Sequence, residues 1–354
     1  MAAHCYIALP MKTHNNPIHH DNTAQLAGHA VRAPGCAPMK SGPWALMALL
    51  AAASASASAQ NAIYLLGEVH DNPTAHAQRF ELIEKLLTGN FKPVIAMEQF
   101  DRDNQAELDL AMHYCKDSDC VIQKAGGKGW EWNFYKPVIE TALKRRLPIV
   151  AANVSSKDAM KIARDGLGAA ISPDTLHDFN LDKPLDSDIF EKQKTAIEIG
   201  HCHMLPNSAL KGMVNAQVAR DVWMAKVVRE NASHGLILLA GNGHVRKDIG
   251  VYHWLSSAER TRTQAIAYTE DDSDAPGGPP APAFDQTVRI EPFERNDPCE
   301  AFTGRTKIQT RLQDSEPDRQ TGLAEGDGHP RPSPTGELFA RRAAWTPAPW
   351  EPIR

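Results

Sequence analysis

The sequence predicts an α/β fold, a mainly parallel doubly wound sheet with a helical insertion at the carboxyl ends of the strands. Short continuous apolar runs alternate with helical periods between residues 61 and 300, and such runs are typical of strands buried on both faces. The stretch from 155 to 232 has helical apolar spacing and no convincing strand. Strands that alternate with helices favour a parallel sheet covered on both sides.

The expected elements follow in chain order. Asn72 and Pro73 predict a helix start, because Asn caps the first turn and Pro fits there. Its apolar face is expected at Phe80, Ile83, Leu86 and Leu87, and Gly89 should end it. A second helix is expected over 133–146, and the insertion should hold helices near 160–167, 189–199 and 213–228. The expected strands are 62–66, 93–97, 148–152, 236–240 and 264–268, with 287–290 as a possible edge strand.

The ends of the chain differ from this core. Lys40, an apolar stretch over 44–53 and small residues up to Ala59 are typical of a signal peptide over 39–59. The alternative is a buried Ala-rich helix. If the signal peptide begins at residue 39, we expect residues 1–38 to be untranslated or disordered. No cysteine follows the cleavage region that could carry a lipid. We therefore expect a soluble periplasmic or secreted protein with a domain over 61–303, a flexible loop at 271–282 and a disordered tail over 304–354.

The composition excludes two classes of protein. The 354 residues carry a formal net charge of −5, whereas a nucleic-acid binder would show a basic patch. No apolar run reaches the 18 or more residues of a membrane span.

Four cysteines remain after the leader: Cys115, Cys120, Cys202 and Cys299. An oxidising compartment permits disulfides, and four cysteines allow three pairings. Cys115–Cys120 is the easiest loop to close, and Cys202 and Cys299 are left either paired or free.

Polar side chains follow several of the expected strands. Glu68, His70, Glu98 and His244 come directly after apolar runs, and ligands bind outside the carboxyl ends of parallel strands. Two histidines and two glutamates predict either a divalent metal set or an acid–base group. The alternative is that each strand simply ends in a solvated polar residue.

The segments GEVHDNP at 67–73, MEQF at 97–100 and AGNGHVRKDIGV at 240–251 resemble the ChaN-type haem-binding uptake family of the Tiki, TraB and erythromycin-esterase-like superfamily. The resemblance covers about 61–303. It implies haem binding and iron uptake at the bacterial envelope, with an outer-membrane haem receptor or a homodimer as partner. The wider superfamily includes metal-dependent hydrolases that use the same strand-end Glu and His positions, here Glu68, His70, Glu98 and His244.

Haem needs an iron ligand, an apolar slot and often a cation for its propionates. The candidates are His201, His203, Tyr135 and, for a propionate, Arg220. Packing in the core is the alternative for Tyr135, and a salt bridge is the alternative for Arg220. One of the two histidines could instead be solvated while the other bonds to backbone. His203 stands where the family is expected to have a small residue.

We therefore expect an exported, non-catalytic haem-binding protein of iron uptake. A metal-dependent hydrolase is the alternative, and a structural envelope protein without a bound ligand is the third hypothesis. The sequence leaves the iron ligand and any enzymatic activity open.

Overall fold

The structure is a computed structural model that describes residues 61–270, 283–295 and 299. The expected signal peptide over 39–59, the segment 1–38, the loop at 271–282 and the tail over 304–354 lie outside the described residues.

A six-stranded parallel sheet forms the centre of the fold, in the order β3-β2-β4-β1-β5-β6. The predicted α/β class is confirmed. β6 pairs only with β5 in this sheet, so the predicted edge strand is also confirmed. The strands are β1 (Ile63–Leu66), β2 (Val94–Asp101), β3 (Ile149–Asn153), β4 (Leu236–Leu239), β5 (Thr263–Thr269) and β6 (Gln286–Arg289).

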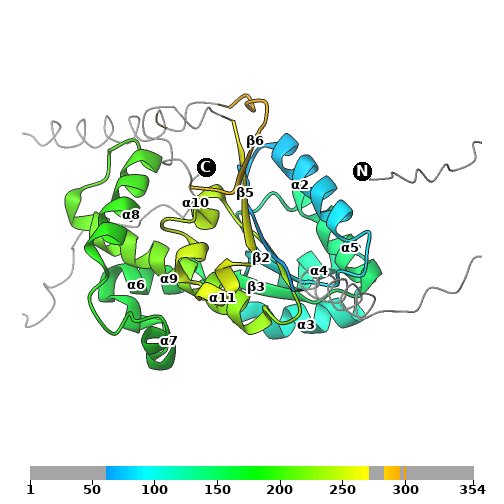
Figure 1. Ribbon diagram of the computed structural model, residues 1–354, viewed down its shortest axis with the longest axis horizontal. Coiled ribbons are helices and arrows are strands. Elements are labelled where there is room, and N and C mark those ends of the chain that lie inside the picture. Colours follow the sequence, from blue (N-terminus) through cyan, green and yellow to red (C-terminus); the bar gives the residue numbers. More distant parts are fainter. Residues whose placement is uncertain (1–60, 271–282, 296–298, 300–354) are drawn as a thin grey trace, which may run out of the picture. The chain divides into compact units, whose positions relative to one another are not determined.

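Helices cover both faces of the sheet (Figure 1). One face carries α2 (Pro73–Leu86), α3 (Gln105–Tyr114), α4 (Ser118–Ala125) and α5 (Lys136–Arg145). The other carries α6 (Ser156–Asp165), α7 (Pro173–Asp178), α8 (Ser187–Gly200) and α9 (Asn207–Asn231). Two short helices, α10 (Asn242–Val245) and α11 (Ser257–Arg260), follow β4. Single 3₁₀ turns lie at Arg102–Asn104, Trp132–Phe134, Leu167–Ala169 and Val251–Trp254.

The helix after β1 begins as the sequence predicts and buries Ile83 and Leu87 of its predicted apolar face, but its buried face also includes polar residues. The Asn72 side chain accepts hydrogen bonds from the backbone N–H groups of Thr74 and Ala75. The buried residues of α2 are Ala75, His76, Arg79 and Ile83, whereas Phe80 and Leu86 are only partly covered. Arg79 and His76 are buried because they find polar partners just after β1, at Glu68 and at the His70 carbonyl.

Two other elements differ from the prediction. β2 continues four residues past Met97, so Glu98 and Gln99 lie inside the strand. The pairing of β2 with β3 shifts register between Met97 and Asp101, which prolongs the strand past its apolar run. The helices α3 and α4 were not predicted from the sequence.

The helical insertion is part of the core as well as a cover for the strand ends. Val214, Val218, Val222 and Ala225 of α9 are fully buried and pack with the sheet residues Ile63 and Leu238 in one apolar cluster. Residues 155–232 contain helices and no strand, as predicted.

Both disulfides are present. Cys115–Cys120 closes the loop between α3 and α4, and Cys202 joins Cys299 across 97 residues of sequence. Disulfides of this kind are typical of oxidising compartments. Within the described ranges, no helix is both long and apolar enough to cross a membrane.

Candidate functional site

A cavity of about 160 Å³ lies at the carboxyl ends of β1, β2 and β4. α8 and α9 close it from the side, so the insertion supplies part of its wall. The polar residues among those that line it are Glu68, His70, Glu98, Gln193, Gln217, Arg220, Asn242, His244 and Arg246. The cavity therefore brings together all four of the strand-end residues that the sequence singled out.

Glu68 is held by a buried set of donors on the α2 side of the sheet. Arg79 donates to its Oε2, the Tyr135 hydroxyl donates to Oε1 at 2.5 Å, and the Gln99 amide lies 3.4 Å from the same oxygen. Burial lowers the pKa of Arg79 to about 10, which still leaves it charged at neutral pH. Arg79 therefore compensates the charge of a carboxylate that is only 2% exposed.

His70 is neutral and oriented by Glu68. Burial lowers its pKa, and its Nδ1 lies 2.6 Å from Glu68 Oε1. Because a carboxylate only accepts, Nδ1 is the donor and Nε2 carries the lone pair. His76 bonds to the carbonyl of His70 at 2.9 Å, and burial lowers the pKa of His76 to about 4. His70 thus presents a basic nitrogen at the edge of the cavity.

A second polar cluster lies on the α9 side of the sheet. His244 Nδ1 is 2.6 Å from Asp221 Oδ1, and its Nε2 is 3.4 Å from Glu98 Oε1. Against the effect of burial, Glu98 and Asp221 raise the pKa of His244 to about 10. Glu98 also accepts from the N–H of Gly241 at 2.8 Å. The two carboxylates are balanced by His244 and by Arg220, whose charge interacts with both.

The two clusters meet at Gly241. A Cβ at this position would lie 2.8 Å from His70 Nε2 and 3.8 Å from Glu98 Oε2, so glycine allows the close approach. The next residue, Asn242, bonds through its side chain to the backbone N–H and carbonyl of Tyr268, and this fixes the turn that places His244.

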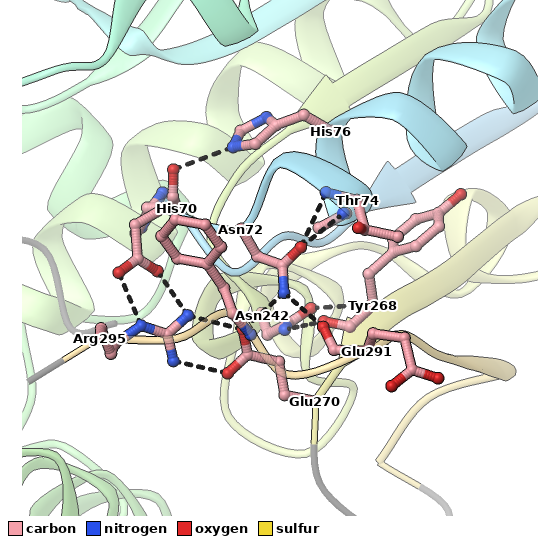
Figure 2. A network of polar contacts seen from close by, with 12 residues as sticks. His70, Asn72, Thr74, His76, Asn242, Tyr268, Glu270, Glu291 and Arg295 are labelled. Carbon is pink, nitrogen blue, oxygen red and sulfur yellow. Dashed lines mark hydrogen bonds and ion pairs between the residues drawn. The ribbon is translucent and has the colours of Figure 1, made fainter. Parts of the chain in front are cut away.

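A charged network ties the segment after β6 to the same end of the sheet (Figure 2). Arg295 forms a bidentate pair with Asp71 at 2.8 and 3.0 Å and contacts Glu270 at 2.6 Å. The Arg295 guanidinium lowers the pKa of Glu270 to about 2. Asn72 donates to Glu270 and to the Glu291 carbonyl, so one side chain joins the α2 cap to this segment.

The predicted metal set is not supported. In the part of the chain that the structure describes, no group of three or more His, Cys, Asp or Glu side chains is placed to hold a metal ion. The carboxylate oxygens of Glu68 accept from Arg79 and Tyr135, and those of Glu98 face His244 and Gly241. Both carboxylates are thus already held by donors from the protein.

Tyr135, a predicted iron ligand, is fully buried beside His76 and Trp132. Its hydroxyl donates to Glu68, and burial raises its pKa, which opposes tyrosinate formation. These contacts favour a supporting role, as the packing alternative supposed.

Among the other predicted haem residues, Arg220 lines the cavity and the two histidines do not. Arg220 lines the cavity and is 6% exposed. His201 caps the end of α8 one turn after Ile197, a lining residue, and its Nδ1 bonds to the Ile197 carbonyl at 2.8 Å. A carbonyl only accepts, so His201 Nδ1 is the donor in this bond. His203 is exposed in the turn that follows.

The sequence reasoning missed Arg79 and Gln193. Gln193 donates to Asp221 Oδ2 at 2.9 Å and to the Ile249 carbonyl at 3.1 Å. A signal for Arg79 existed, because residues 76, 79 and 83 share a helix face. No such signal pointed to Gln193, whose partners are 28 and 56 residues away.

A larger cavity of about 530 Å³ lies between the loop 178–186 and the segment 253–260. None of the strand-end residues or predicted haem residues lines it, so the candidate site is the smaller cavity.

Comparison with known proteins identifies the family. Residues 54–255 match the profile described as haem-binding uptake, Tiki superfamily, ChaN. No curated protein matches the chain. Among solved structures, the ChaN of Campylobacter jejuni with cofacially bound haem is 20% identical, with a TM-score of 0.49 over 63% of this chain and 87% of its own.

A mutant of the erythromycin esterase EreC in its open conformation is 16% identical, with a TM-score of 0.36 over 65% of this chain and 74% of its own. Likenesses of this size carry no argument about function. The profile match spans more than half of the chain, and on that ground this protein is a member of the ChaN haem-binding uptake family of the Tiki superfamily.

Proposed function

We propose that this protein is an exported haem-binding protein of bacterial iron uptake and that it is not catalytic. The match of residues 54–255 to the haem-binding uptake family carries the proposal. Export to the periplasm or medium agrees with the two disulfides and with the signal-peptide pattern over 39–59. An outer-membrane haem receptor or a second copy of the chain is the partner that such a function would use.

The strand-end cavity alone is too small for a porphyrin. Its volume of about 160 Å³ is below the roughly 300–1,000 Å³ of pockets that enclose small-molecule ligands. The residues around the end of α8 suit a macrocycle bound at the rim. His201 brings an imidazole to this end of the helix, Ile199 and Met204 are 38% and 39% exposed, and Arg220 is a cation that lines the cavity.

We therefore assign His201 as the iron ligand and Arg220 as the propionate partner, and we do not carry Tyr135 forward. Haem supplies the iron that the protein would carry as cargo. What the chain does is orient the imidazole, because the bond from Nδ1 to Ile197 fixes both the ring and its tautomer.

A haemin titration of the mature protein tests this function. We expect a saturable Soret band at low micromolar protein, and we expect His201→Ala to weaken binding at least tenfold. His203→Ala is the matched control, because it removes the exposed imidazole two residues away, and Tyr135→Phe should keep the band. An equal loss of haemin affinity in His203→Ala would contradict the assignment of His201 as the iron ligand. If haemin gives no Soret change with the wild type, haem binding is rejected.

Acid–base hydrolysis is the second candidate, and the pairing of a neutral His70 with a protonated His244 across one cavity favours it. General acid–base catalysis uses this combination of an oriented base and a nearby acid. If the protein hydrolyses activated esters, we expect His70→Gln to remove that activity while haemin binding is kept. If the wild-type protein hydrolyses the tested esters no faster than buffer alone, hydrolysis of those esters is excluded.

A further inference from the structure

The turn that follows α8 lies beside the candidate site and is covalently linked to the end of the domain. α8 supplies Gln193 and Ile197 to the cavity wall. Just after the helix, Cys202 is bonded to Cys299, with their Cα atoms 5.8 Å apart. Any change at this disulfide therefore acts on the helix end that carries His201.

The backbone of this turn is unfavourable for its sequence. Cys202 and His203 have φ angles of 57° and 55°, in the left-handed region that normally selects glycine. Two bonds support the turn, from Cys202 N–H to the Ile199 carbonyl at 3.0 Å and from His203 N–H to the Glu198 carbonyl at 2.8 Å. Two consecutive non-glycine residues in this conformation need an external restraint, and the disulfide provides one.

Close in sequence to Cys299, Arg295 is anchored by contacts near the end of β1. Arg295 is held by Asp71 and Glu270, and Asp71 directly follows the cavity residue His70 (Figure 2). The Phe293 N–H adds a bond to Glu270 at 3.1 Å. Cys299 is four positions from Arg295 in the sequence, so the disulfide links the end of α8 to a residue close in sequence to this anchored arginine.

We propose that Cys202–Cys299 is a site of thiol–disulfide exchange with a dithiol reductant, and that its reduction weakens ligand binding at the adjacent cavity. The effect on binding rests on the proposed haem function. A thiolate of the reductant attacks one sulfur and forms a mixed disulfide, and its second thiol then releases the protein. Two electrons and two protons pass to Cys202 and Cys299, and the reductant leaves as a disulfide. Both cysteines are partly exposed, so the bond is open to attack.

The second disulfide offers a matched control. Cys115–Cys120 spans five positions between α3 and α4, and neither of its cysteines lines the cavity. α3 and α4 cover the sheet face opposite to α8 (Figure 1). Breaking this bond removes a disulfide without touching the turn at His201.

The first experiment compares two double variants of the full chain, Cys202→Ser with Cys299→Ser and Cys115→Ser with Cys120→Ser. We expect the haemin dissociation constant to rise at least fivefold in the first and to stay within twofold in the second. We also expect faster hydrogen exchange in peptides covering 193–206 only in the first. Equal haemin affinity in both variants and the wild type would overturn the link to binding.

The second experiment treats the wild-type protein with a limited amount of a reduced thioredoxin-type dithiol protein and then with an alkylating agent. Peptide mapping should find label on Cys202 and Cys299 before Cys115 and Cys120. Preferential labelling of Cys115 and Cys120, or no labelling, would refute the exchange site. Hydrogen exchange and cysteine labelling can both be measured without haem. If the wild type fails to bind haemin, the proposed function is rejected, and these two measurements still test the exchange site.

Discussion

Arg79→Leu should lower the free energy of unfolding by about 3–5 kcal/mol, the range for breaking a buried ion pair from one side. Arg79 is 1% exposed, donates to Glu68 and lies 3.0 Å from His76 Nδ1. Its loss leaves the Glu68 carboxylate buried without a cation. Urea unfolding followed by circular dichroism measures the change.

Two controls distinguish the effect of breaking the ion pair on the free energy of unfolding from the effect of losing a long side chain. Arg145→Leu removes an arginine 3.5 Å from Glu84 that is 39% exposed, and it should cost less than about 1 kcal/mol. Adding Glu68→Gln to Arg79→Leu removes the unpaired charge and should restore part of the stability. If Arg79→Leu costs no more than Arg145→Leu, Arg79 does not compensate Glu68.

His244→Gln is expected to have an effect of similar size, about 3–5 kcal/mol near pH 6, because it removes the cation in direct contact with two buried carboxylates and leaves only Arg220 to balance them. Glu98 and Asp221 both face His244, at 3.4 and 2.6 Å. Urea unfolding at several pH values measures the difference from the wild type. His177→Gln is the control, since its side chain is 81% exposed.

The difference should depend on pH in a defined direction. The pKa of His244 is raised from 6.5 to about 10, so its contribution to stability is complete below pH 6.5 and is lost as the pH rises toward 10. His244 and the Gly241 N–H lower the pKa of Glu98 below its usual 4.5, against the effect of burial. Its contribution is present above pH 4.5 and is lost in acid. A difference that grows from pH 7 to 10 would contradict the assigned charges.

Several features of the site were predictable because they depend on local patterns. The four strand-end residues Glu68, His70, Glu98 and His244 follow or end apolar runs, and parallel strands bring such positions to one edge. The cap at Asn72 is also local, since the side chain bonds two and three residues ahead. Cys115–Cys120 closes the shortest available loop.

The partners of these residues were not predictable, because they come from distant segments. Arg79 reaches Glu68 only when α2 packs against the end of β1, and the apolar pattern of α2 marks Ile83 and Leu87 as buried but gives no sign that Arg79 is buried beside them. Gln193 and Asp221 meet because α8 packs on α9. Tyr135 looked like a ligand by residue type, but its hydroxyl donates to a carboxylate 67 positions away.

The sequence by itself determined the α/β class, the strand positions, the all-helical insertion and the group of strand-end side chains, because apolar period and capping are properties of neighbouring residues. The tertiary structure alone decided three things: which charges compensate each other, how small the cavity is, and that Cys202 joins Cys299. Charge compensation and cavity size depend on distances between elements far apart in the chain, and side-chain packing sets those distances. One sequence pattern is compatible with several such packings, and only the folded chain selects among them.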